Sequence, residues 1–398
     1  MNRHRFSTEE ILICRRSLLA WYDVNKRKLP WRDWHDTDSN IVAYRVLVSE
    51  LMLQQTQVAT VIRYYETWMN QWPNLKSLAD ACEDDVLKCW AGLGYYNRAR
   101  NLYKCAQLIV NEYKGEFPQD LEVMINRLPG VGRYTAGAVS SIAFSQPNPI
   151  LDGNVIRVVS RLRCIGGDLK KKSTTDFLWS LATDLVCPDR PGDLNQSLME
   201  LGATICTPQK PKCTECPIQN QCLSYQQQIH QSINDIEQCS TNCLFCLKKT
   251  DIDSNRSLVE HYPRKKSKTK QREETSLILI LYRIKPKLEF LMFKQKQSNL
   301  LAGLWSFFDI ITPTDFDQMN ERKRKTFLME EIQHITLNID NIKLAGQCRH
   351  LFSHIDKQYI IYYTQYDQND ISISTAQVQW FTEEQVQASA ISTAMKKV

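Results

Sequence analysis

The sequence predicts a mainly α-helical N-terminal domain followed by an α+β C-terminal domain, and three observations support this fold class. Over residues 8–228, apolar residues recur three and four positions apart, which is the spacing of helices with one buried face. Beyond the middle of the chain the pattern changes to β-branched and aromatic runs of strand length, at 277–282 and 359–363. A helical pattern at about 320–333 lies between these two runs. Helices mixed with strands in the last third of the chain predict an α+β domain there.

Length and composition are those of a soluble globular protein with more than one domain. At about 150 residues per domain, we divide the 398 residues into a helical domain at 1–228, a connector at 229–274 and the α+β domain at 275–398. Hydrophobic residues make up 43% and charged residues 24%, which allows a sizeable core. Lys and Arg outnumber Asp and Glu by 50 to 44, so the net charge of +6 is compatible with a polyanionic partner without indicating one by itself. No run approaches the about 18 apolar residues of a membrane span, and the chain does not begin with the apolar core of a signal peptide. We therefore expect neither a membrane-spanning nor a secreted protein.

Short glycine-containing turns divide the N-terminal part into separate helices. Apolar stripes at helical spacing appear at 41–51 and 178–185, and turns appear at 92–94, 129–132 and 166–167. We find no alternating pattern typical of strands before the connector, so we expect this domain to be all α.

The turn at 128–137 is the first of four motifs that suggest chemistry. Gly130 and Gly132 flank a β-branched residue between two helical patterns, which predicts a tight hairpin. The backbone N–H groups at the start of the following helix would suit a phosphate oxygen. The hairpin is by itself only a turn, but the whole string resembles the helix-hairpin-helix element of DNA-repair glycosylases.

Four cysteines near the end of the helical part indicate a metal centre. They lie within 17 residues, and their thiolates can surround one metal site: Cys206, Cys213, Cys216 and Cys222. Their spacing differs from the paired knuckles of a zinc ribbon and looks like the [4Fe–4S] loop of the endonuclease III superfamily. Tetrahedral zinc is the alternative.

The third and fourth motifs that suggest chemistry each contain a carboxylate. Glu50 sits on an otherwise apolar helical face, where burial would raise its pKa and suit it to act as a general acid. Asp152 precedes Gly153 and a helical run, so it is either an N-cap or a group aimed into a cleft. A structural role for Glu50 is the competing interpretation.

Together and in this order, the motifs resemble the adenine-specific mismatch DNA glycosylases of the MutY family. The resemblance begins at 29–32 and spans nearly the whole chain, the strings at 49–58 and 92–96 are specific to that family, and the ending at 391–397 looks like its animal members. The resemblance implies a helix-hairpin-helix glycosylase domain with a [4Fe–4S] loop, followed by a Nudix-like α+β domain. It also implies a monofunctional enzyme of base excision repair that flips out adenine mispaired with 8-oxoguanine or guanine and leaves an abasic site.

The same resemblance implies the catalytic residues. Glu50 would protonate adenine N7, and ionised Asp152 would stabilise the oxocarbenium ion or bond to it transiently. Tyr134 and Asn154 would orient these groups, with Arg27 as a helper. Bifunctional relatives resemble this hairpin but carry a lysine where Tyr134 stands, and a phenol cannot form a Schiff base.

Lesion recognition is implied for residues of both domains. Gln55 and Tyr95 would act as the wedge, and Thr56 and Leu93 would touch the lesion base. In the C-terminal domain, the loop that checks for 8-oxoguanine would be formed by Phe352, Ser353 and His354, with Ser353 as the hydrogen-bond partner. The alternative is that this triplet merely closes a turn. The glutamate cluster of Nudix hydrolases is missing, so we expect no nucleotide pyrophosphatase activity.

The connector resembles the zinc-binding connector of animal members. Three of its cysteines would bind a structural zinc ion, namely Cys239, Cys243 and Cys246. The resemblance points to His4 as the fourth ligand. His230 and His261 are nearer in sequence and stay open as alternatives, as do free thiols. Six of the nine residues at 264–272 are basic, which suits a solvated linker, a phosphate-contacting segment or a nuclear-localisation signal. We expect a nuclear protein, with a mitochondrial location left open.

Two other functions compete with this interpretation. One is an endonuclease III-type glycosylase/lyase for oxidised pyrimidines, and Tyr134 argues against it. The other is a lesion-binding protein without catalysis, and the presence of both Glu50 and Asp152 argues against it. As partners we expect double-stranded DNA with an adenine:8-oxoguanine mismatch, and repair or replication factors through the connector. We expect a monomer.

Overall fold

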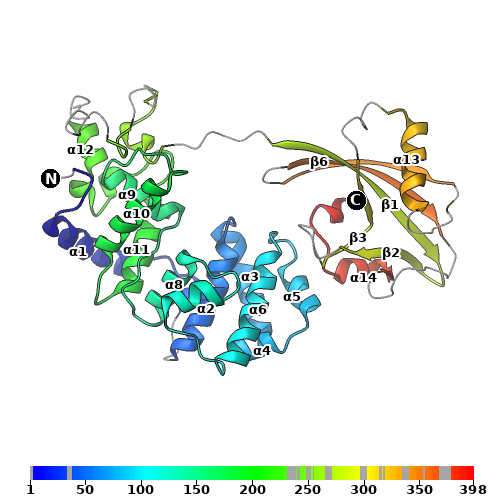
Figure 1. Ribbon diagram of the computed structural model, residues 1–398, viewed down its shortest axis with the longest axis horizontal. Helices are drawn as coiled ribbons and strands as arrows, with labels where there is room; N and C mark the ends of the chain where they lie inside the picture. Colours follow the sequence, from blue (N-terminus) through cyan, green and yellow to red (C-terminus); the bar gives the residue numbers. More distant parts are fainter. Residues whose placement is uncertain are drawn as a thin grey trace. The chain divides into compact units, whose positions relative to one another are not determined.

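The computed structural model describes most of the chain (Figure 1). The described residues are 3–33, 38–230, 239, 243–247, 252–253, 255–264, 271–295, 303–312, 316, 319–333, 339, 341–352, 355–366 and 378–398. By their internal contacts they form two units, Met1–Ala79 with Lys104–Ser267 and Asp80–Tyr103 with Lys268–Val398. Residues 80–103 therefore group with the C-terminal unit, although the predicted boundary lies at 228.

The N-terminal part is helical, as predicted, and its described residues contain no strand. Its elements are α1 (Thr8–Asn25), η1 (Pro30–Arg32), α2 (Ser39–Leu53), α3 (Val58–Gln71), α4 (Leu75–Ala79), α5 (Glu83–Trp90), α6 (Asn97–Glu112), α7 (Leu121–Arg127), α8 (Arg133–Ala143), α9 (Gly153–Leu162), α10 (Lys172–Leu185), α11 (Pro191–Thr204), η2 (Cys213–Glu215), η3 (Gln219–Gln221), α12 (Leu223–Ile229) and η6 (Leu258–His261). None of the described helices is both long enough and apolar enough to cross a bilayer.

Helix α2 lies at the centre of the first unit. It contacts α3 and packs extensively against α8, while α11 contacts α1, α8 and α9. Ten of the fifteen residues of α2 are buried, which explains why its sequence is apolar nearly all round instead of on one face. Gly137 of α8 permits close packing, because a Cβ there would lie 2.4 Å from the Pro149 carbonyl oxygen. Residues of α2, α8, α9 and the second half of α11 line one cavity.

The C-terminal unit contains a mixed sheet with helices beside it, as the α+β prediction requires. Its further elements are β1 (Arg272–Ile284), β2 (Leu288–Lys294), β3 (Trp305–Ser306), β4 (Phe308–Ile311), α13 (Glu321–Gln333), β5 (Lys343–Leu351), β6 (Ile355–Gln365), β7 (Val378–Thr382), α14 (Glu383–Ala388) and η8 (Met395–Lys397). The strand order is β3-β2-β1-β6-β5, with β4 paired to β1 and β7 paired to β2. The central pair, β1 and β6, is parallel, and all other pairs are antiparallel.

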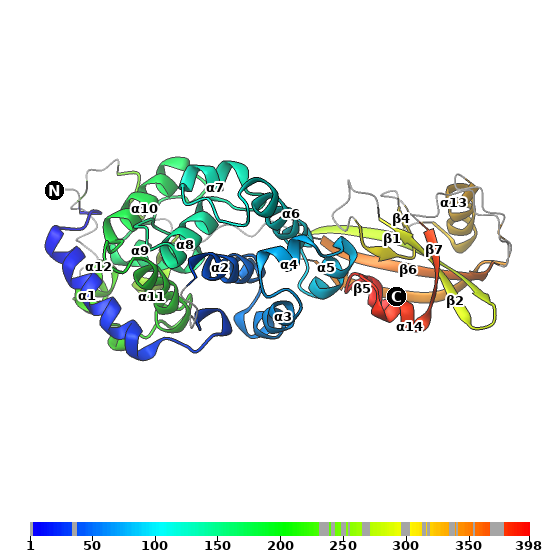
Figure 2. The same ribbon diagram turned by 90° about the horizontal axis from the view of Figure 1, so that it is seen from below.

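Both faces of this sheet are covered. Leu277 and Tyr362 belong to the apolar cluster on one face, together with Leu328 of α13. Ile278 and Tyr359 belong to the cluster on the other face, together with Met395 of η8. Figure 2 shows α13 and α14 on opposite sides of the strands. Burial on both faces explains the unbroken apolar runs that predicted β1 and β6.

A small cluster of charges is buried in the same sheet. Lys357 of β6 is only 8% exposed. Its Nζ lies 3.2 Å from Glu274 Oε1 of β1 and 3.5 Å from Asp309 Oδ2 of β4. The two carboxylates compensate the ammonium group, since a buried charge is tolerated only when it is paired.

Candidate active site

Glu50 lies in the last turn of α2 and is 6% exposed. Burial among apolar neighbours raises the pKa of its carboxyl to about 7, and the nearby charge of Asp152 adds to this effect. The Tyr134 hydroxyl, from the first turn of α8, donates to Glu50 Oε2 at 2.5 Å and moderates the shift in pKa. A carboxyl with such a pKa is partly protonated at neutral pH and can serve as a general acid.

Asp152 is the N-cap of α9, and it also lines a cavity. Its Oδ1 accepts from the backbone N–H of Val155 at 2.7 Å, and its Oδ2 accepts from Asn154 Nδ2 at 2.8 Å. The N-cap interpretation of the sequence is therefore correct, and the cleft interpretation holds at the same time. Both oxygens act as acceptors, which is the arrangement of an ionised carboxylate.

One cavity of about 390 Å³ is lined by both carboxylates. This volume lies within the range of small-molecule sites. Its lining includes Arg27, Arg32, Glu50, Gln55, Thr56, Tyr134, Asp152, Asn154, Met199 and Glu200. All five residues predicted for catalysis thus face the same space, together with two of those predicted for lesion recognition.

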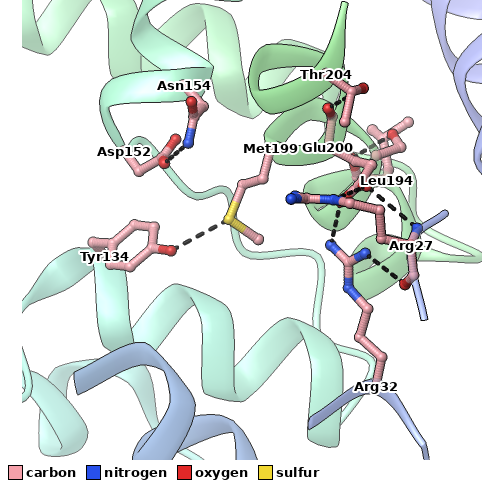
Figure 3. Close-up of polar contacts among 10 residues, drawn as sticks. Arg27, Arg32, Tyr134, Asp152, Asn154, Leu194, Met199, Glu200 and Thr204 are labelled. Atoms are coloured by element: carbon pink, nitrogen blue, oxygen red, sulfur yellow. Dashed lines mark hydrogen bonds and ion pairs between the residues drawn. The ribbon is translucent and has the colours of Figure 1, made fainter. Parts of the chain in front are cut away.

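A buried ion-pair network forms one side of this cavity (Figure 3). Glu200 of α11 accepts from Arg27 Nε at 2.5 Å, and Arg32 Nη2 lies 2.9 Å from its other oxygen. Burial alone would raise the pKa of Glu200, but the two guanidinium groups outweigh burial and hold that pKa below its usual range. Glu200, Arg32 and Met199 are not among the residues predicted from the sequence. The signal for Glu200 was available, because it stands alone between apolar residues of a helix, as Glu50 does.

Arg157 of α9 connects the Asp152 end of this site to the cysteine loop. Its Nη2 donates to Asn154 Oδ1 at 2.8 Å and to the Gly202 carbonyl at 2.7 Å, while its Nε donates to the Cys206 carbonyl at 2.7 Å. Gly202 is required at its position, because a Cβ there would lie 2.6 Å from Asn154 Cβ. The Asn154 side chain is thus held from two sides.

Outside the C-terminal domain, the residues predicted to contact the lesion base or the DNA backbone lie between helices, and their exposure differs. Gln55 follows α2 with a left-handed backbone (φ of 56°). In the second unit Tyr95 is also left-handed (φ of 50°) and 37% exposed, whereas Leu93 is 7% exposed. In the hairpin, Gly130 has a φ of 77° and Gly132 is the N-cap of α8, with no side-chain cap among the described residues. The first N–H groups of α8 are therefore available to a phosphate.

The structure describes only the first residue of the predicted 8-oxoguanine loop. The Phe352 N–H donates to the Ile355 carbonyl at 2.8 Å, which closes the turn between β5 and β6. The Phe352 ring contacts that of His350 edge-on, with 4.6 Å between centroids. Ser353 and His354 lie outside the described residues.

The four cysteines predicted to hold a cluster line one pocket between α11 and α12. Arg161, which is 1% exposed, donates from Nη1 to Cys206 Sγ at 3.3 Å, and Ser224 Oγ lies 3.4 Å from Cys222 Sγ. Four thiols around one pocket, with hydrogen-bond donors beside the sulfurs, are the donor set that an iron–sulfur cluster requires. These residues therefore fit the group.

A second group of possible metal ligands comes together around His4. Its Nε2 lies 3.3 Å from Cys246 Sγ and 3.4 Å from the Sγ atoms of Cys239 and Cys243. The four ligand atoms lie within 4.8 Å of one another. His261, one of the alternatives, instead accepts from the Asp253 backbone N–H at 2.8 Å. His4 is thus the histidine that the structure places with these thiols.

Comparison with known proteins identifies the same two functional regions. Residues 48–183 match the HhH-GPD superfamily of base excision DNA repair proteins, and residues 206–222 match the iron–sulfur binding domain of endonuclease III. The second match covers the four cysteines and favours an iron–sulfur cluster over the alternative of zinc.

The similarity to curated proteins spans nearly the whole chain. An adenine DNA glycosylase of Mus musculus is 42% identical over 99% of this chain and 79% of its own length. One of Schizosaccharomyces pombe is 39% identical over 91% of this chain and 84% of its own length. The C-terminal part is similar to the Nudix domain of Shewanella oneidensis NrtR, at 13% identity over 34% of this chain and 88% of that one, with a TM-score of 0.26.

Proposed function

The chain belongs to the adenine DNA glycosylase family, and we propose that it removes adenine mispaired with 8-oxoguanine or guanine from double-stranded DNA. One observation carries the chemical part of this proposal. Glu50, a carboxyl with a raised pKa, and Asp152, a carboxylate accepting two hydrogen bonds, line the same cavity. Two carboxyl groups in different protonation states are what hydrolysis of a glycosidic bond needs.

The reaction needs the adenine outside the base stack, so the nucleotide is flipped into the cavity. Glu50 donates its proton to adenine N7 while the bond between N9 and the sugar C1′ breaks, and the electron pair of that bond stays on the purine. The Tyr134 hydroxyl, which donates to Glu50, stabilises the carboxylate that remains. Asp152 stabilises the oxocarbenium ion. Water then adds to C1′, and its proton returns to Glu50.

The cavity supports a monofunctional enzyme. Strand cleavage through a Schiff base needs an amine at the sugar. Among the described residues that line the cavity, the cationic groups are the arginines Arg27 and Arg32, and no lysine is present. Tyr134 stands in the first turn of α8, where its hydroxyl donates to Glu50 and cannot form a Schiff base. The alternative of a glycosylase/lyase is therefore the weaker one.

A single-turnover assay tests the activity directly. Enzyme in excess over an adenine:8-oxoguanine duplex should release free adenine and leave an alkali-labile site. Glu50→Gln should reduce the rate constant by at least about a hundredfold, the usual contribution of general acid catalysis. Adenine release by Glu50→Gln at the wild-type rate, or a covalent complex trapped by borohydride, would contradict the mechanism.

Recognition of 8-oxoguanine rests on the resemblance of the loop at Phe352, Ser353 and His354 to that of the family. Ser353→Ala should lower the ratio of the rate on adenine:8-oxoguanine to the rate on adenine:guanine duplexes. Loss of one hydrogen bond corresponds to a change in this ratio of about three- to tenfold. An unchanged ratio with Phe352 and His354 intact would remove this assignment.

Two metal centres complete the proposal. The four cysteines at 206–222 would hold a [4Fe–4S] cluster that orders the loop against α9. His4 with Cys239, Cys243 and Cys246 would hold a structural zinc ion, a ligand set that closes a tetrahedral site. His4 Nδ1 lies 2.8 Å from the Arg163 carbonyl, so this nitrogen carries the hydrogen and Nε2 presents its lone pair to the metal.

The proposal also includes a nuclear location, which the basic run at 264–272 of the connector suggests. Imaging of the tagged protein in cells tests this location.

A further inference from the structure

The Tyr134 hydroxyl has two acceptors within hydrogen-bond distance. One is Glu50 Oε2 of α2, at 2.5 Å, and the other is Met199 Sδ of α11, at 3.3 Å. Figure 3 shows the Met199 thioether directed at the hydroxyl from the side of α11. A phenol carries a single hydrogen, so a full hydrogen bond to one acceptor weakens the bond to the other.

Which acceptor prevails depends on the proton of Glu50. An ionised carboxylate is a much stronger acceptor than a thioether, because the bond is charge-assisted. When Glu50 is protonated, this advantage disappears and its own hydroxyl must also be accommodated. The thioether sulfur then competes as a neutral, weak acceptor.

We propose that Met199 is a positioning residue that accepts the Tyr134 hydrogen whenever Glu50 carries its proton, and that this second acceptor stabilises the protonated acid and moves the alkaline limb of the pH profile to higher pH. The inference rests on the proposed function, in which Glu50 is the acid. When the Glu50 proton passes to adenine, the phenol turns to the new carboxylate. The Tyr134–Glu50 bond is then strongest in the transition state, where it contributes to the rate.

Other titratable or charged groups face Glu50 and must stay constant in any test. They are Tyr134 of α8, Asp152 at the start of α9 and Arg32 of η1, with Arg27 and Glu200 on the same cavity. Met199→Leu leaves all of them in place. It preserves an apolar side chain of similar volume and removes only the sulfur acceptor.

The test is the pH profile of single-turnover adenine release by the full chain, from pH 5.5 to 8.5. Met199→Leu destabilises the protonated ground state without changing the transition state. The alkaline limb should therefore move by about half a pH unit to lower pH, which is about threefold in proton affinity, and the acidic plateau should rise by up to the same factor. At pH values above the alkaline limb, the rate constants of the wild-type protein and of Met199→Leu should converge.

A packing role gives a different result. If Met199 only shapes the cavity, Met199→Leu changes the rate by the same factor at every pH, and this outcome would overturn the inference. The same substitution made in a Tyr134→Phe background should leave the limb where it is, because the phenol hydrogen is absent. A shift that persists in that background would also overturn the inference.

Two controls separate this inference from the proposed function. Met124→Leu, at a buried methionine of α7 outside the described cavity lining, should reproduce the wild-type profile. If the wild-type chain releases no adenine from any duplex, the proposed function itself fails. If it releases adenine but Met199→Leu has the wild-type limb, only the role of Met199 fails.

Discussion

Replacing Glu50 by Gln should stabilise the fold above neutral pH and leave its stability nearly unchanged in acid. The pKa of Glu50 is raised by burial from 4.5 to about 7 in the folded protein. Between these pH values the unfolded chain has lost the proton and the folded chain has kept it, so rising pH favours unfolding. The stability that the proton contributes is fully present below about pH 4.5 and is lost as the pH rises through about 7.

The size of this stabilisation follows from the shift in the pKa of Glu50. One pKa unit corresponds to about 1.4 kcal/mol, so a shift of about 2.5 units costs the folded wild-type protein about 3 kcal/mol at pH 8. Gln cannot ionise, and its amide oxygen still accepts from the Tyr134 hydroxyl. For a domain of this size, 1 kcal/mol moves the Tm by about 2–4 °C, so the variant should melt at least about 6 °C higher at pH 8.

Thermal unfolding of the two proteins side by side, at pH 5, 6, 7 and 8, measures this difference. Comparison at equal pH cancels the titration of all other groups. Glu66→Gln, at an exposed carboxylate of α3, serves as the matched control and should show no pH-dependent difference. A Tm difference for Glu50→Gln that is constant from pH 5 to 8 would refute the reasoning, since the carboxyl would then titrate normally and could not act as the acid.

Three further predictions concern other parts of the molecule. Lys357→Ala should lower the free energy of unfolding of the C-terminal unit by about 3–5 kcal/mol, because two carboxylates lose their buried partner. Lys357→Arg should lower this free energy less, and urea unfolding that shows the same decrease for both variants would contradict the ion-pair explanation. His4→Ala should remove most of the zinc that metal analysis finds in the wild-type protein, because a tetrahedral site loses one of its four ligands; undiminished zinc would exclude this ligand set. Arg157→Met should slow single-turnover adenine release by about tenfold through the loss of two or more hydrogen bonds, whereas Arg63→Met on α3 should not.

The elements of the fold were predictable where burial follows a local pattern. The apolar runs at 277–282 and 359–363 became β1 and β6, and the helical pattern at 320–333 became α13. What the sequence did not indicate is that β1 and β6 are parallel neighbours, with Leu277 opposite Ile360. Strand pairing and the grouping of residues 80–103 depend on contacts between distant segments, and periodicity carries no information about them.

Residues of the site were predictable where the residue type and its sequence surroundings indicate a chemical role. A lone carboxylate on an apolar helix made Glu50 a candidate acid, and the cysteine spacings indicated metal ligation, while the family resemblance supplied the roles of these residues. Glu200 carries the same signal, a lone carboxylate between apolar residues of a helix, but it lies outside the motifs that resemble the family. Met199 is different, because nothing about a methionine in a helix indicates that its sulfur accepts a hydrogen bond. Only the distance to Tyr134 shows it.

The two buried glutamates of the cavity differ in pKa because they have different partners. Glu50 has one neutral donor, Tyr134, whereas Glu200 has two guanidinium groups. The same arginines, if they were free to turn towards Glu50, would stabilise its carboxylate and lower its pKa. Arg32 already lowers the pKa of Glu50, as the smallest of the four effects on that group, while its guanidinium is paired with Glu200. Arginines held by Glu200 therefore leave burial as the largest effect on the pKa of Glu50, which stays at about 7.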